Sequence, residues 1–210
     1  MGRRLQKETK LVRVYGDLVA KLNEASNREG ISFLDYINSA LEQAVRAHKM
    51  GRSLKDIVDF YEMMMMQREA GLVMVPSEVL NKITERFYPN EKNMLESMWY
   101  ESGVWYGKYL LVKVKREDPT DVFGEMLKAT GWNIKDVVLE RRGEKLTFKC
   151  FSLMLSLENT ALLMRFIEGV METLGYEVVS QNYLRGVIEI EFRKITKVDL
   201  SSIINKKLGV

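Results

Sequence analysis

The stretch TKLVRVYGDLVAKLNEASNREGISFLDYINSALEQA, residues 9–44, changes its apolar periodicity from that of a strand to that of a helix. Val12 and Val14 fall on one face of an extended segment, while its other face carries Thr9, Leu11 and Arg13. Only one of these faces can lie in a core. We therefore expect a short strand whose valines are covered by another part of the protein or by a partner.

Two amphipathic helices are expected after this strand. Gly16 and Asp17 interrupt the alternation, and apolar residues then recur at helical spacing until Gly30, which should end the first helix. Ser32 precedes the second helix and Asp35 follows three residues later, an arrangement that approximates a capping box. The apolar stripes are Leu18, Leu22 and Ala25 in the first helix and Ile37, Ala40, Leu41 and Ala44 in the second.

In this order of strand, helix and helix, residues 9–44 resemble the ribbon-helix-helix family of DNA-binding proteins (the CopG/Arc/MetJ type) and align with its pattern without a gap. The resemblance implies a homodimer, because two chains of such a protein pair their strands into an antiparallel ribbon. The ribbon enters the major groove of double-stranded DNA, which admits two strands as readily as a helix. A strand and two amphipathic helices can also form an ordinary dimerisation arm, and that alternative stays open.

The resemblance also implies roles for individual residues. Thr9, Leu11 and Arg13 occupy the outward strand positions that contact base edges in the family, and a guanidinium such as that of Arg13 can pair with guanine through two hydrogen bonds. The corner Gly30-Ile31-Ser32, with Phe33, corresponds to the point where the second helix holds a DNA phosphate. Further phosphate contacts are expected from the basic leading segment, at Arg3, Arg4, Lys7 and Lys10.

The composition indicates a soluble globular chain, with 210 residues of which 46% are hydrophobic and 29% charged. Its net charge of +3 is mild, so DNA contact is expected only in the N-terminal part. No apolar run is long enough to cross a membrane, and the first residues lack the apolar core of a secretion signal. We therefore expect a cytoplasmic protein.

Cysteine and histidine are too few for most disulfide or metal chemistry. Cys150 is the single cysteine and His48 the single histidine, which excludes an intrachain disulfide and leaves no cluster of soft ligands for zinc. Cys150 alternates with Leu146 and Phe148 and is predicted to be a small core residue. The C-terminal part has no histidine and no glycine-rich phosphate loop, so we expect neither an enzyme nor a cofactor.

Glycine and charge at residues 49–52 interrupt the helical pattern and mark a boundary. We expect four segments: a ribbon-helix-helix domain over residues 1–49, a linker helix over 50–71, an α+β domain over 72–195 and a basic tail over 196–210. The linker helix contains four consecutive methionines, residues 63–66, which cannot all face one way. Methionine runs suit adaptable contact surfaces, and a core helix with spare methionines fits equally well.

The fold class predicted for the chain is α+β. Pro89 is expected to end a short helix that begins at Ser77 and to precede a longer helix over roughly residues 91–113. Gly103 and Gly107 lie four apart in that longer helix, so another backbone can approach one of its faces. The remaining pattern predicts a helix over 119–131, a hairpin over 133–141 and 145–153, a helix over 156–175, and a hairpin over 176–183 and 187–194.

This order of elements resembles the 4-vinyl reductase domain, a small-molecule-binding relative of the haem nitric-oxide-binding and transport-particle folds, over roughly residues 72–195. Many members of that family carry cysteines near the central helix and the last hairpin, whereas this chain has only Cys150. An apolar or aromatic effector, held between the first long helix and the sheet, is therefore expected rather than a metal or haem. The lining would be the following aromatic residues, for which core or dimer interface is the alternative role: Trp99, Tyr100, Trp105, Tyr106, Tyr109 and Trp132.

Together these features predict a homodimeric or larger DNA-binding transcription regulator, a repressor, whose C-terminal domain binds an effector or mediates further assembly. Three alternatives remain. The chain could be a DNA-organising or partition protein whose C-terminal domain recruits a protein partner, an antitoxin-like protein that neutralises a toxin, or an interaction scaffold that binds no DNA.

Overall fold

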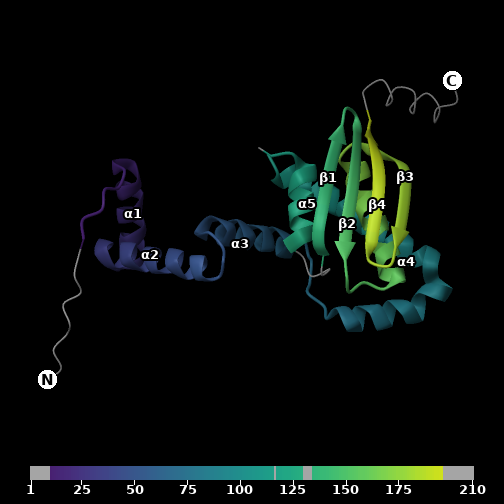
Figure 1. Ribbon diagram of the computed structural model, residues 1–210, viewed down its shortest axis with the longest axis horizontal. Helices are drawn as coiled ribbons and strands as arrows, with labels where there is room; N and C mark the ends of the chain where they lie inside the picture. The colour runs from purple at the N-terminus through teal and green to yellow at the C-terminus, as the bar shows by residue number, and fades with distance from the viewer. Residues whose placement is uncertain (1–9, 116, 130–133, 196–210) are drawn as a thin grey trace. The chain divides into compact units, whose positions relative to one another are not determined.

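The structure is a computed structural model and describes residues 10–115, 117–129 and 134–195 (Figure 1). It has a mixed α+β fold, with helices throughout and one four-stranded antiparallel sheet in the C-terminal half. The chain divides into two compact units, Met1–Asp59 and Phe60–Val210. The boundary between these units falls within helix α3 (Leu54–Glu69).

The N-terminal unit contains the two expected helices, α1 (Gly16–Glu29) and α2 (Phe33–Lys49). Gly30 ends α1 in the left-handed region at φ +71°, and its N–H donates to the carbonyl of Asn27. The hydroxyl of Ser32 accepts a hydrogen bond from the N–H of Asp35 at 3.1 Å, so Ser32 is the N-cap of α2. Both predicted helix ends are therefore confirmed.

The strand expected over residues 9–14 is not formed in the single chain. Residues 10–15 belong to no helix or strand, and α1 begins directly after them, at Gly16. A strand requires a neighbouring strand to accept and donate its main-chain hydrogen bonds. None of the strands in the structure pairs with this segment. Thr9 lies outside the described residues.

The C-terminal unit is built on a sheet of two hairpins, with strand order β1-β2-β4-β3. The first hairpin joins β1 (Ile134–Arg142) to β2 (Lys145–Ser152), and the second joins β3 (Tyr176–Leu184) to β4 (Val187–Lys194). Both predicted hairpins are confirmed to within about two residues at each end. The helices of this unit, besides α3, are α4 (Ser77–Lys113), α5 (Pro119–Ala129) and α6 (Leu157–Thr173).

The core lies between the sheet and the helices α5 and α6, which cover one face while the other face stays open (Figure 1). Phe148, Ile190 and Phe192 on the covered face are fully buried. Lys149 and Glu189, their neighbours along the strands, lie on the opposite face because side chains alternate along a strand. Each strand is therefore buried on one face and exposed on the other. Helix α6 forms the central layer between the sheet and α4.

Helix α4 consists of two helices that meet at a kink, close to the break that Pro89 predicted. It runs from Ser77 to Lys113 and is kinked at Glu91, where φ is −120° and ψ is 23°. A proline inside a helix removes one main-chain N–H and crowds the preceding turn, which bends the helix without necessarily ending it. The expected boundary between the two helices is therefore confirmed, and it lies at the kink at Glu91.

The glycines of α4 allow close packing against α6, as their spacing predicted. A Cβ added at Gly107 would lie 2.6 Å from Cβ of Thr173, and a Cβ added at Gly169 of α6 would lie 2.2 Å from the carbonyl oxygen of Tyr100. Neither distance leaves room for an atom. The two helices therefore meet backbone to backbone, and this contact fixes the side chains on both helices next to it.

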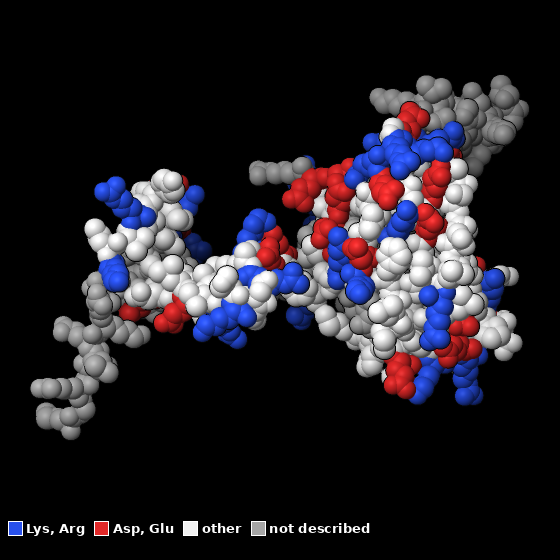
Figure 2. All heavy atoms as spheres, viewed as in Figure 1, with Lys and Arg blue, Asp and Glu red and all other residues white. Residues whose placement is uncertain are grey.

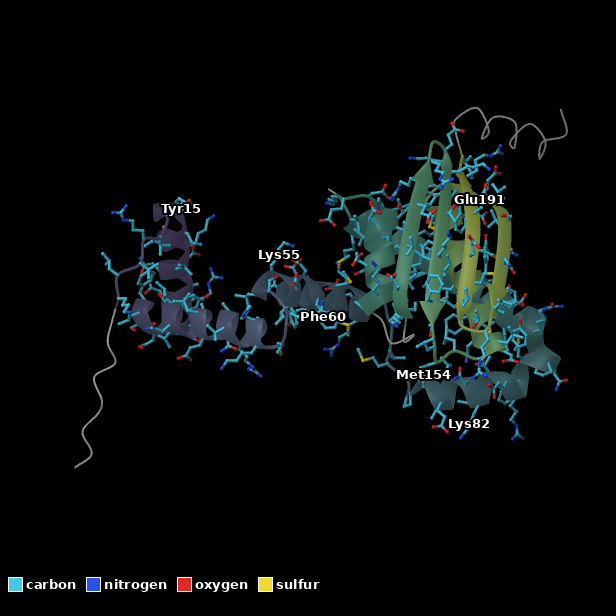
Figure 3. All side chains as sticks on the ribbon, in the orientation of Figure 1. Tyr15, Lys55, Phe60, Lys82, Met154 and Glu191 are labelled. Carbon is cyan, nitrogen blue, oxygen red and sulfur yellow. The ribbon has the colours of Figure 1, made fainter. Side chains whose placement is uncertain are left out.

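The first half of α4 is held by hydrogen bonds to the start of α6. Asn81 donates to the carbonyl of Met154 at 2.8 Å and accepts from the amide nitrogen of Asn159 at 2.7 Å. Thr84 donates to the side-chain oxygen of Asn159 at 2.9 Å. Figure 3 labels Met154 and Lys82 on the two neighbouring segments. These bonds place Ser77–Pro89 beside the connection between β2 and α6.

Candidate nucleic-acid interface and ligand pocket

The N-terminal unit buries very few of its own residues. Among residues 10–59 only Ser26 and Ala47 are buried. Helix α2 is apolar over a wide face, but besides buried Ala47 only Phe33, Tyr36, Ile37 and Ala44 on it are half-buried. The rest of that face is exposed, with the side chains of Leu34, Leu41 and Val45 55% to 60% accessible.

A groove of about 900 Å³ runs along the exposed side of α2. Its apolar lining comes from Leu34, Leu41 and Val45, which follow one another at helical spacing. Polar and charged side chains also line it: Lys10, Asp35, Asn38, Ser39, Glu42, Arg46 and Lys49. An apolar stripe with a mixed polar rim is the surface expected of a protein–protein contact.

The candidate DNA-contacting residues that the structure describes before α1 lie on exposed chain. Leu11 is 99% accessible and Val12 is 72% accessible, and Lys10 and Arg13 are exposed as well. Because the strand is not formed, the outward positions Leu11 and Arg13 are not separated from the inward positions Val12 and Val14 by a pleat. Four of the candidate residues, Arg3, Arg4, Lys7 and Thr9, lie outside the described residues.

The corner before α2 has the geometry of a helix N-terminus with free amides. Ser32 caps Asp35, while Gly30 and Ile31 donate to the end of α1, at the carbonyls of Asn27 and Ser26. The N–H groups of Phe33 and Leu34 belong to the first turn of α2, which has no internal acceptors for them. The hydroxyl of Ser32 also donates to the carboxylate of Asp35 at 2.6 Å. This arrangement can present main-chain N–H groups to a phosphate.

The open face of the sheet has no continuous positive surface. Lys149 lies 3.5 Å from the carboxylates of both Glu140 and Glu189, and Lys145 pairs with Glu191. Figure 2 shows blue and red side chains interspersed over this face of the C-terminal unit. The cations Lys145 and Lys149 on this face thus already have carboxylate partners, which compete with a DNA backbone for them.

The C-terminal unit contains a pocket of about 570 Å³ among its helices. Its walls come from the second half of α3, from the segment 71–75, from α4 and from Phe166 of α6. The volume falls within the range of sites that hold drug-sized ligands. The lining is mostly apolar: Met64, Ala70, Leu72, Val73, Met74, Val75, Leu80, Trp99, Trp105, Tyr106, Leu155 and Phe166, with Gln67, Arg68, Gly71, Ser77 and Ser102.

The structure brings three of the predicted aromatic residues, Trp99, Trp105 and Tyr106, to this pocket. Tyr109 lies outside the lining but stacks on Trp105, with ring centroids 5.8 Å apart. Tyr100 is turned to α6, where its hydroxyl bonds Glu172. Trp132 lies outside the described residues. The alternative role of these aromatic residues, as core residues, also applies to Tyr106, which is 3% exposed and packs in the core.

The position of the pocket differs from the one expected. A site between the long helix and the sheet was predicted, whereas no described residue of the lining belongs to a strand. The reason is that α6 lies between α4 and the sheet and fills that space with its own side chains. The aromatic face of α4 is therefore directed to α3 and to residues 71–75.

Sequence reasoning missed Met64, Arg68 and the segment 72–75. The methionine run was the one signal for this wall, because it indicated a contact surface. Met64 lines the pocket, Met63 and Met66 pack against the core, and Met65 remains 36% exposed. The four methionines therefore lie partly in the core, partly in the pocket wall and partly at the surface. No pattern in the sequence indicated Arg68 as a lining residue.

Cys150 is a core residue, as predicted. Its side chain is 1% exposed, and burial, with a smaller contribution from Asp136, raises the pKa of its thiol to about 12. Burial similarly raises the pKa of Tyr106, whose hydroxyl contacts the sulfur of Met126. No three potential metal ligands come together within residues 10–115, 117–129 and 134–195. None of the described helices is long and apolar enough to cross a bilayer.

No known protein family matches the chain, and no curated protein is detectably similar to it. The geometry of the two sites is therefore the basis for a functional assignment.

Proposed function

We propose that the protein is a sequence-specific DNA-binding transcription regulator, a repressor that acts as a homodimer through a ribbon-helix-helix N-terminal unit. The observation that carries the proposal is the exposed apolar surface of that unit. Residues 10–59 bury only two side chains, while Leu34, Leu41 and Val45 of α2 stay exposed. A unit with so little core needs a partner to be stable.

A second copy of the chain is the partner that suits this surface. Two segments over residues 9–14 would pair as antiparallel strands and satisfy each other's main-chain hydrogen bonds. Val12 and Val14 would then face the exposed stripe of α2, and Arg13 would face away from it. The expected strand would thus form on dimerisation, which accounts for its absence from the single chain.

DNA is the ligand that suits the opposite face of such a ribbon. Its outward positions would be Thr9, Leu11 and Arg13, of which Arg13 would pair with a base and Leu11 could contact a thymine methyl group. The capped start of α2 at Ser32 would hold a phosphate on each side of the ribbon. The C-terminal unit would bind an effector in the helical pocket, next to α3, which leads along the chain to the N-terminal unit.

The test is selection of bound duplexes from a random DNA pool by the full chain, followed by titrations of the enriched duplex at several salt concentrations. We expect a short palindrome to be enriched, and its affinity to fall by about tenfold or more between 50 and 200 mM salt as phosphate contacts are screened. Salt-sensitive binding without sequence enrichment would instead identify a DNA-organising protein. Absence of binding to any duplex would overturn the proposal.

A further inference from the structure

We propose that the helical pocket binds an amphipathic monocarboxylic acid, with its carboxylate on Arg68 and its apolar body against Met64, Trp99 and Trp105. This inference rests on the proposed function in one respect, since it names the chemical class of the effector. The binding site itself depends only on the residues of the pocket.

Arg68 gives the pocket its charge. It is the one charged residue among the described lining residues, and none of the ion pairs formed by the described residues involves it. The adjacent carboxylate of Glu69 is occupied elsewhere, because it accepts from Lys113 at 2.7 Å and from Tyr109 at 3.2 Å. That hydrogen bond from Lys113 lowers the pKa of Glu69. Arg68 lines the pocket, and Glu69 does not compete for its guanidinium donors, so these donors are available to an anion.

The remainder of the pocket selects an apolar body. Trp105 is held flat by stacking on Tyr109, at an angle of 13° between the rings, and the hydroxyl of Tyr109 is itself fixed by the carbonyl of Met66 at 3.0 Å. Trp99 packs edge-on against Phe166, with centroids 6.3 Å apart. These contacts preorganise two indole rings as walls. Flexible Met64 and Met74 can adjust to aromatic or aliphatic shapes.

The charge of the site distinguishes a carboxylate from a phosphate. A phosphate carries nearly two charges and is usually held by several cations or by a cluster of main-chain N–H groups. Here one guanidinium is present, and it can match one carboxylate through two parallel hydrogen bonds. A nucleotide is also disfavoured, since its sugar and phosphates would meet apolar walls. A monocarboxylic acid with an apolar tail satisfies both parts of the pocket.

The experiment compares decanoate with decanol, which share one apolar chain and differ in the carboxylate. Binding to the full chain is measured without DNA, by titration calorimetry and by the fluorescence of the tryptophans, two of which line the pocket. The variants are Arg68→Gln and Arg68→Lys. Arg86→Gln is the matched control, because Arg86 is also exposed and lies outside the pocket. Ser102→Tyr, at an exposed lining position, fills the pocket without disturbing the core.

We expect decanoate to bind about fivefold to tenfold more tightly than decanol, a modest factor because Arg68 is exposed to solvent. Arg68→Gln should remove this preference and leave decanol binding unchanged, while Arg68→Lys should retain part of it. Arg86→Gln should leave both ligands unaffected, and Ser102→Tyr should weaken both. Equal binding of the two ligands, a preference that survives Arg68→Gln, or no binding of either would overturn the inference. Since DNA is absent, those results would leave the DNA-binding proposal standing.

Discussion

A Cβ atom added at Gly103 would lie 2.1 Å from the carbonyl oxygen of Phe166, a distance that no real side chain occupies. The main chains of α4 and α6 are therefore in direct contact at Gly103 and Phe166. The contact has a consequence for the pocket, because Trp99 and Trp105 flank Gly103 on the same helix and Phe166 lines the opposite wall. Separation of these two helices would change the core and the pocket together.

Gly103→Ala should lower the free energy of unfolding of the C-terminal unit by about 3 kcal/mol, because α4 and α6 would have to move apart. Denaturant unfolding followed by tryptophan fluorescence measures this change. The matched control is Gly124→Ala in α5, where the added Cβ would lie 3.2 Å from a terminal methyl carbon of Leu139 that can move aside. We expect the control to change stability by about 1 kcal/mol or less. Equal effects of the two variants would contradict the proposed helix contact.

The α+β half of the fold could be predicted because its signals are local. Gly143 and Gly186 have positive φ values, +62° and +72°, at the turns between alternating strands, and glycine is the residue that adopts such turns readily. Gly103 and Gly107 similarly predicted a close helix contact from their spacing. Such features depend on a few adjacent residues, so a single sequence contains them.

The features that were missed depend on long-range packing. The aromatic face of α4 was visible in the sequence, whereas the insertion of α6 between α4 and the sheet was not. Arg68 became a candidate only when the elements around it were placed.

The dimer proposal predicts that Val14→Asp reduces self-association of the full chain by at least about tenfold, since a carboxylate would be buried between the paired strands. Leu11→Asp is the matched control, because position 11 would lie on the outward face of the ribbon. Sedimentation equilibrium should give a dimer for the wild type and for Leu11→Asp, and predominantly monomer for Val14→Asp. A monomeric wild type, or equal dissociation of the two variants, would be incompatible with paired strands.

Cys150 should be unreactive in the folded protein. Burial raises the pKa of its thiol to about 12, so the thiolate is scarce at pH 8. Because the thiol pKa is higher in the folded state, the buried neutral thiol contributes fully to the free energy of unfolding at pH values below the unfolded pKa. That contribution is lost as the pH rises from the unfolded pKa toward about 12. We expect Ellman's reagent at pH 8 to react with Cys150 only when denaturant is added, with Cys150→Ala as the blank. Rapid labelling of the native protein would place the thiol at the surface.

The most direct test of the central claim measures how Arg13→Ala and Ser32→Ala change binding to the selected palindrome and to a random duplex at one fixed salt concentration. If Arg13 pairs with a base, Arg13→Ala should weaken binding to the palindrome by about 1 to 3 kcal/mol more than binding to the random duplex. Ser32→Ala should weaken both by a similar amount, because a phosphate contact carries no base information. Equal losses for both variants on both duplexes would contradict base recognition by the proposed ribbon.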